Sequence, residues 1–265
     1  KYANRRLYNT ATSSYVTLLR NMGPAIDVPP QAGWLPPQAF TTDTDPRGLA
    51  IADFNSDGRH DAAAVAAGPS DVSLHLGDGM GHFGAGSGYP ASASVRALQL
   101  GDVNKDGKVD ALTVGGTGVF SVLLGNGNGA LGAKNDVDSG GTSHDLAVAD
   151  LDGNGTLDAV TDNTNVSALR AYSGNGSGGF AAPVVSALPG ANGCSQVDVK
   201  LADINADGKI DAVVAMGSCG QVDLMLGNGA MGFTGTSITM GSQPGHIVVA
   251  DFNKDGRPDL AASDM

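Results

Sequence analysis

A nine-residue acidic segment recurs five times along this chain, and no other feature of the sequence constrains the fold as strongly. Each copy follows the pattern D-x-[DN]-x-[DN]-G-x-x-D, and successive copies begin 48 to 53 residues apart. The copies are DFNSDGRHD from Asp53, DVNKDGKVD from Asp102, DLDGNGTLD from Asp150, DINADGKID from Asp203 and DFNKDGRPD from Asp251. A period of this length predicts a repeat architecture, in which one supersecondary unit is duplicated along the chain.

Short apolar runs surround every acidic segment and predict four strands per repeat. One run precedes the segment and a second follows it, and both are rich in small and β-branched residues, as buried strands are. A third run ends in Gly-Asn-Gly or Gly-Asp-Gly in most repeats, which supplies the positive φ angles of a tight hairpin turn. Six residues past the first of those glycines, an apolar residue anchors the expected fourth strand. These anchors are Phe83, Leu131, Phe180 and Phe233.

Four antiparallel strands in each repeat of about 48 residues predict an all-β protein, a β-propeller of five four-stranded blades. A stacked β-solenoid is the alternative, but the turns of solenoids are usually shorter. All 27 acidic residues are Asp and none is Glu, and 40 residues are Gly, which favours turns over helices. We expect one domain over residues 1-265, with blade repeats at about 53-101, 102-149, 150-202 and 203-250, and a fifth made of 251-265 plus 1-52.

The fifth repeat ends after its second strand, and the N-terminal region contains a match for the missing part. Residues Tyr15–Asn21 have the pattern of Phe120–Asn126, and Ile26 stands in register with the fourth-strand anchors. We therefore expect N-terminal outer strands to pair with C-terminal inner strands, which closes the ring and removes unpaired strand edges. The alternative is exchange of these strands between copies, which would build a head-to-tail filament.

The acidic segments have the oxygen-rich composition of calcium-binding loops. Ca²⁺ takes six to eight oxygen ligands, which side chains at positions 1, 3, 5 and 9 and the carbonyl at position 7 can supply, while Gly at position 6 permits a sharp turn. Three carboxylates in nine residues would repel one another without a cation, and about five Ca²⁺ ions would move the formal charge from −12 to about −2. Asx-rich turns without metal are the alternative. By loop, the predicted ligands are Asp53, Asn55, Asp57, Arg59 and Asp61; Asp102, Asn104, Asp106, Lys108 and Asp110; Asp150, Asp152, Asn154, Thr156 and Asp158; Asp203, Asn205, Asp207, Lys209 and Asp211; and Asp251, Asn253, Asp255, Arg257 and Asp259.

This combination, a strand, the acidic loop and a following D-[AL]-x-V strand, resembles the FG-GAP/VCBS-type repeats of integrin α-subunit propellers and propeller lectins. The resemblance covers residues 47 to 265 strongly and 14 to 46 weakly, and it implies a calcium-stabilised module for adhesion or recognition. Such propellers often have seven blades, so five repeats imply a small ring or part of a longer chain. A second resemblance links KYANRRLYNTATSSYVTL, at Lys1 to Leu18, to bacterial polyhydroxyalkanoate-synthesis regulators. We interpret this segment as a strand of the fifth blade.

The two cysteines predict a disulfide. Cys194 lies nine residues before the fourth acidic segment and Cys219 lies eight residues after it, so the two stand nearly opposite each other in an antiparallel hairpin. Two buried free thiols are the alternative. A disulfide implies an oxidising compartment, and we therefore expect a secreted or cell-surface protein.

Charge and motifs narrow the function to binding. A net charge of −12 argues against a nucleic-acid partner, and no apolar run approaches the roughly 20 residues of a membrane span. H-E-x-x-H and G-x-S-x-G do not occur, so we expect no enzyme, with a hydrolase on a propeller scaffold as the alternative. We expect an extracellular module that binds a glycan or protein ligand and can self-associate. We also expect a polar ligand rim formed by Arg47, Arg96 and His144, each six residues before its acidic segment, with solvated loop residues as the alternative.

Overall fold

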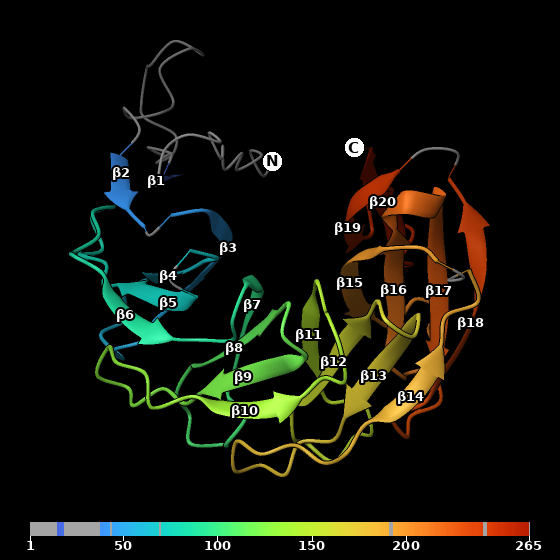
Figure 1. Ribbon diagram of the computed structural model, residues 1–265, viewed down its shortest axis with the longest axis horizontal. Coiled ribbons are helices and arrows are strands. Elements are labelled where there is room, and N and C mark those ends of the chain that lie inside the picture. The colour runs from blue at the N-terminus through green and yellow to red at the C-terminus, as the bar shows by residue number, and fades with distance from the viewer. Residues whose placement is uncertain are drawn as a thin grey trace.

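Four antiparallel sheets, arranged along an arc like the blades of a propeller, make up most of the structure (Figure 1). The structure is a computed structural model, and it describes residues 15–18, 38–42, 44–68, 70–190, 193–240 and 243–264 of the chain. Within those residues the protein is all-β except for one short 3₁₀ helix, η1 (Gly217–Cys219). The predicted all-β class with propeller-like blades is confirmed, whereas the count of five four-stranded blades is not.

Each complete sheet is a meander of four strands that starts with the strand before its acidic loop. The first strand of each sheet lies on the inside of the arc and the fourth lies outside (Figure 1). The sheets are β3 (Pro46–Ala52), β4 (Asp61–Ala66), β5 (Asp71–His75) and β6 (Ser87–Pro90); β7 (Val95–Gly101), β8 (Asp110–Gly115), β9 (Val119–Leu123) and β10 (Asn135–Asp138); β11 (Leu146–Ala149), β12 (Asp158–Asn163), β13 (Ala168–Tyr172) and β14 (Val184–Ala187); and β15 (Gln196–Ala202), β16 (Asp211–Met216), β17 (Gln221–Gly227) and β18 (Phe233–Thr239).

The core lies between neighbouring sheets. Every residue of β4, β8, β12 and β16 is buried, and the apolar side chains of these second strands pack against neighbouring sheets. Such strands are built from small and β-branched residues, as in DAAAVA and DAVVAM, since the sheets pack closely there. The second residue of each of the first four acidic loops packs toward the next sheet: Phe54, for example, belongs to one apolar cluster with Leu123 and Leu131.

The fourth strands begin later than their anchors in three of the four sheets. Phe83, Leu131 and Phe180 each form a single bridge to the glycine that ends the third strand, and the strand proper follows a few residues on. In the fourth sheet, Phe233 itself begins β18. The turn between is an Asx turn: in the second sheet the side chain of Asn126 accepts the N–H groups of Asn128 and Ala130.

Two further hairpins stand at the ends of the arc. β19 (Pro244–Ala250) pairs with β20 (Asp259–Asp264), and β1 (Tyr15–Leu18) pairs with β2 (Gln38–Thr41). Among the described strands, neither β1 nor β2 pairs with β20, so the predicted closure of the ring is not confirmed. The segment around Tyr15 is a strand, as expected, and one of its edges pairs with β2. Residues 19–37, including Ile26, lie outside the described residues.

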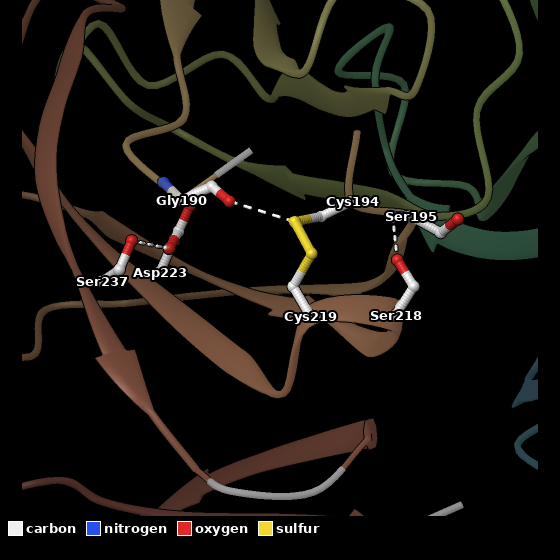
Figure 2. Close-up of a disulfide and its surroundings, with 7 residues drawn as sticks. All are labelled: Gly190, Cys194, Ser195, Ser218, Cys219, Asp223 and Ser237. Atoms are coloured by element: carbon white, nitrogen blue, oxygen red, sulfur yellow. Dashed lines mark hydrogen bonds between the residues drawn. A yellow bond between two sulfur atoms is a disulfide. The ribbon is translucent and has the colours of Figure 1, made fainter. Parts of the chain in front are cut away.

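The predicted disulfide is confirmed. Cys194, just before β15, is bonded to Cys219 in η1, with their Cα atoms 5.6 Å apart (Figure 2). The N–H of Ser195 donates to the Ser218 hydroxyl at 2.8 Å, so the two segments are also joined by a hydrogen bond beside the sulfur atoms. The disulfide links the entry of the fourth sheet to the turn between its second and third strands.

Candidate functional site

The acidic loops lie at one end of the sheets, each between the first and second strands. In the first loop both carboxylate oxygens of Asp53 accept backbone N–H groups, from Asp57 at 3.2 Å and Gly58 at 2.8 Å. The side-chain amide oxygen of Asn55 also accepts the N–H of Asp57, and the Asp57 carboxylate accepts the N–H of Arg59. The second, third, fourth and fifth loops repeat these bonds. The loop therefore gathers the oxygens of positions 1, 3 and 5 on its inner side.

Glycine at position 6 is required by conformation and not by lack of space. Its φ lies between 76° and 84° in all five loops. A Cβ on Gly58, Gly107, Gly208 or Gly256 would meet no atom within 4 Å, so a substitution would strain the backbone without any clash.

The aspartate at position 9 closes each complete loop from inside the protein. Asp110 is fully buried, and its two oxygens accept the N–H groups of Val103 at 2.9 Å and Gly125 at 2.8 Å. Gly125 ends the third strand so close to the loop that an added Cβ would lie 2.0 Å from the carbonyl oxygen of Val109. Asp61, Asp158 and Asp211 make the same pair of bonds in their sheets.

The third loop shows the donor set most clearly. Carboxylate oxygens of Asp150, Asp152 and Asp158 lie within 4.8 Å of one another, and among the described residues this is the one such group of three acids, histidines or cysteines. The other loops have Asn at position 3, where an amide oxygen takes the equivalent place. Burial raises the pKa of Asp158, and the nearby Asp152 and Asp150 raise it further, although hydrogen bonds from Gly174 and Leu151 oppose them. A bound cation would relieve that repulsion, so the residues present suit Ca²⁺.

A hollow of about 440 Å³ lies at the other end of the inner strands, and it contains the predicted ligand residues. The pairing of β3 with β4 shifts register between Pro46 and Gly48, which leaves Arg47 unpaired in the ladder. The same shift leaves Arg96 unpaired in β7 and Val197 unpaired in β15. Bulges of this kind re-aim a side chain out of the regular alternation of a strand. All three bulged residues line the hollow.

His144 enters the hollow without a bulge, because it precedes β11. Its backbone N–H and that of Asp145 both donate to one oxygen of the buried Asp162, at 2.7 and 3.0 Å. The Nδ1 atom of His144 lies 3.5 Å from the other carboxylate oxygen of Asp162. The structure therefore brings Arg47, Arg96 and His144 together, and their role as ligand residues stays a prediction.

Asp145, Asp198 and Lys200 form an ionic cluster in the same hollow that was not predicted from the sequence. Asp145 accepts the N–H of Val199 at 2.9 Å, and Asp198 accepts the N–H of Ile247 at 2.5 Å, so each aspartate bonds the inner strand of the following sheet. Lys200 donates to both carboxylates. One signal could have revealed the cluster: the two aspartates occupy the same position, five residues before their acidic segments.

The pKa values of Asp145 and Asp198 are shifted in opposite directions. Burial, followed by the hydrogen bond to Asp198, raises the pKa of Asp145 to about 7. Burial also acts to raise the pKa of Asp198, but hydrogen bonds from Asp145, from the N–H of Ile247 and from Lys200 outweigh it and lower that pKa. Near neutral pH the cluster therefore carries one full negative charge on Asp198, a partial charge on Asp145 and the positive charge of Lys200.

Comparisons with known proteins agree with this architecture. The FG-GAP-like repeat family matches residues 102–161 and 203–262, which contain the second to fifth acidic loops. A second family, the PHB/PHA accumulation regulator DNA-binding domain, matches residues 1–22, of which the structure describes β1 alone. No curated protein matches the chain. Among the described residues no helix has the length and apolar character needed to cross a bilayer.

Solved structures share the fold. One is a lectin from Agrocybe aegerita, studied for its specific recognition of non-reducing terminal N-acetylglucosamine, with a TM-score of 0.58 and 23% identity over 85% of this chain. Another is BBS1N in complex with ARL6DN, with a TM-score of 0.63 and 11% identity over 96% of this chain. The chain spans 65% of the lectin chain and 69% of BBS1N. It therefore contains FG-GAP-like repeats, and its fold is that of a β-propeller.

Proposed function

We propose that this protein is an extracellular, calcium-stabilised binding module whose ligand site is the hollow opposite the acidic loops. The observation that carries the proposal is the convergence of bulged or strand-entry side chains from successive inner strands on one hollow. If these strands had only a packing role, Arg47 and Arg96 would not need to be excluded from the strand pairing by β-bulges. The acidic loops join the first and second strands at the opposite end of the sheets, so the residues that line the hollow can differ between repeats.

Calcium is proposed as the structural cofactor. The loops recur five times with the same backbone bonds, and the third gathers three carboxylates within 4.8 Å. When bound, Ca²⁺ would be held by oxygens at positions 1, 3, 5, 7 and 9, and it would fix the first and second strands of each sheet. Because the site forms only in the folded hairpin, occupancy stabilises the fold by mass action.

An extracellular location is proposed from the disulfide. The Cys194–Cys219 bond persists in oxidising compartments and is rare in a reducing cytosol. FG-GAP-like repeats are typical of extracellular proteins, and the solved lectin that shares the fold supports recognition of a glycan or protein.

The unpaired edge of β20 favours a second candidate function, strand exchange between copies. β20 has no partner on its outer side among the described strands, and such an edge can pair with another chain. Analytical ultracentrifugation over a hundredfold range of concentration tests it: growing oligomers support a filament subunit, whereas one unchanging species rejects it.

A glycan and protein array tests the binding function. We expect calcium-dependent binding to a small set of ligands, reduced by Arg96→Ala in the hollow. Lys134→Ala is the matched control, because Lys134 is an exposed basic residue just before the outer strand β10, away from the hollow and the acidic loops. Binding that Lys134→Ala abolishes while Arg96→Ala leaves it intact would place the site outside the hollow, and turnover in a hydrolase screen would contradict a module that only binds.

A further inference from the structure

We infer that the hollow selects a ligand with an oxyanion, a carboxylate or phosphate on a molecule of about monosaccharide size. The inference rests on the proposed binding function and goes beyond it by naming the ligand class. Its first observation is that each of the five inner strands, or the residue leading into it, contributes one basic side chain to the same hollow. They are Arg47, Arg96, His144, Lys200 and His246.

This concentration of basic groups stands out against the rest of the chain. The sequence has a formal charge of −12 and only 15 lysines and arginines. Three of those 15 line the hollow, together with two of the five histidines. A cationic depression in an acidic protein focuses the potential and raises the local concentration of anions.

The two carboxylates that line the hollow offset the charge of Lys200, but they do not pair with Arg96 or Arg47. Asp145 and Asp198 are 8% and 3% exposed, and their oxygens are already engaged by backbone N–H groups of the next sheet and by Lys200. The side chain of His246, by contrast, is 86% exposed. A ligand that enters therefore meets the basic groups first.

Arg96 is the best candidate for the direct contact. Arg47 is held by Asp45 at 2.6 Å, and Lys200 is held by its two carboxylates, whereas no ion pair of Arg96 is found among the described residues. A guanidinium presents a planar fork of donors that matches a carboxylate or phosphate with two parallel hydrogen bonds. The bulge in β7 directs that fork into the hollow.

Size and composition of the hollow fit a small charged ligand. A volume of about 440 Å³ lies within the range of small-molecule sites. None of its described lining residues is Phe, Tyr or Trp, so these residues offer no aromatic ring against which a neutral sugar could stack. Charge and hydrogen bonding remain as the source of selectivity.

Isothermal titration calorimetry with three probes tests the inference. Glucuronate carries a carboxylate, glucose 6-phosphate carries a phosphate, and glucose is the neutral control. We expect at least one anionic probe to bind at least tenfold more tightly than glucose, to lose tenfold or more in affinity in Arg96→Ala, and to weaken as salt is raised. Lys134→Ala should bind as the wild type does, and circular dichroism checks that each variant is folded.

The outcomes separate the two proposals. If glucose binds as tightly as the anionic probes, or if no anionic probe binds at millimolar concentration, the oxyanion inference is overturned. The binding function then survives if an array ligand still depends on Arg96. If anionic probes bind but Arg96→Ala and Arg47→Ala leave their affinity unchanged, the hollow is not the site, and the inference is equally overturned.

Discussion

The four complete sheets and the β19–β20 hairpin contain the same loop in different surroundings. Phe54 and Phe252 both occupy position 2 of an acidic loop, yet Phe54 is 3% exposed and Phe252 is 56% exposed. Phe54 packs into the second sheet, where the N–H of Gly129 also donates to its carbonyl oxygen at 3.0 Å. Phe252 has no following sheet among the described residues. The residue at position 2 of the loop therefore contributes to packing only where a neighbouring sheet covers it.

The closing aspartates show the same contrast. Asp110 is fully buried and accepts one N–H with each oxygen, including that of Gly125 at the end of the third strand. Asp259 is only partly buried, and the N–H groups of Phe252 and Asn253 both reach its Oδ2 atom. Without a third strand the fifth loop lacks the donor that would hold its second oxygen, so we expect this loop to be the least ordered of the five.

Calcium removal should have the largest effect and should act on both kinds of sheet. Each site that is saturated at a hundredfold excess over its Kd stabilises the fold by about 2.7 kcal/mol. We expect EDTA to lower the melting temperature by more than 10 °C, measured by differential scanning calorimetry. At limiting calcium, hydrogen exchange should rise first in the β19–β20 loop. An unchanged melting temperature, or a fifth loop that is protected longest, would break the comparison.

Truncation of the position 2 residues should separate the two regions next. Phe54→Ala should lower the free energy of unfolding by about 3–5 kcal/mol, because it empties a packed contact between sheets. Phe252→Ala should cost less than about 1 kcal/mol, because most of that side chain is exposed. Urea unfolding measures both. Equal losses would mean that something covers the β19–β20 hairpin in solution, either the N-terminal strands of the same chain or another copy.

The closing aspartates should show a difference of the same kind and of similar size. Asp110→Ala leaves the buried N–H groups of Val103 and Gly125 unpaired, which costs about 1–3 kcal/mol each, and Asp259→Ala should cost under 1 kcal/mol. The comparison is made in EDTA, so that loss of calcium affinity does not enter. A larger loss for Asp259→Ala than for Asp110→Ala would contradict the role assigned to the third strand.

The smallest effect concerns the bonds between inner strands. Asp145 joins the third and fourth complete sheets, and its pKa is raised to about 7, so the folded state holds a proton that the unfolded chain releases near pH 4. Its stabilisation is present below about pH 4 and is lost as pH rises through about 7. Asp145→Asn should remove this dependence, whose slope is on the order of 1 kcal/mol per pH unit within that window.

Asp198 joins the fourth sheet to the β19–β20 hairpin, and its pKa is lowered. Its contribution is present above about pH 4 and is lost in acid, so Asp198→Asn should change the profile with the opposite sign. Chemical unfolding at saturating calcium from pH 3 to 8 measures both variants. Two profiles that change in the same direction would contradict the assignment.

Much of this arrangement could be predicted from the repeat. The strand before and after each acidic loop, the burial of the second strand and the Cys194–Cys219 bond all follow from local patterns that recur at fixed spacing. The convergence of Arg47, Arg96 and His144 followed from alignment of the repeats, because equivalent positions in a propeller meet near its axis.

Other features depend on contacts between repeats, which periodicity does not encode. Alignment of the repeats places Asp145 and Asp198 at equivalent positions, but it does not place Lys200 between them, because that depends on the approach of neighbouring inner strands. The closure of the ring by Tyr15–Leu18 is not confirmed, and the pattern alone does not decide it: a strand pattern specifies which face is apolar, but it leaves the choice of partner open. The Asx turn does not account for the later start of three fourth strands, because the fourth sheet has the same turn at Asn228 and its fourth strand begins at Phe233.

Native mass spectrometry of the purified chain, with calcium titrated and then removed by a chelator, tests the central claim most directly. The account predicts up to five bound calcium ions per chain, four of them retained at lower free calcium than the fifth, and all released by the chelator. A mass that does not change between calcium and chelator would show that the acidic loops are metal-free turns, and it would contradict the account.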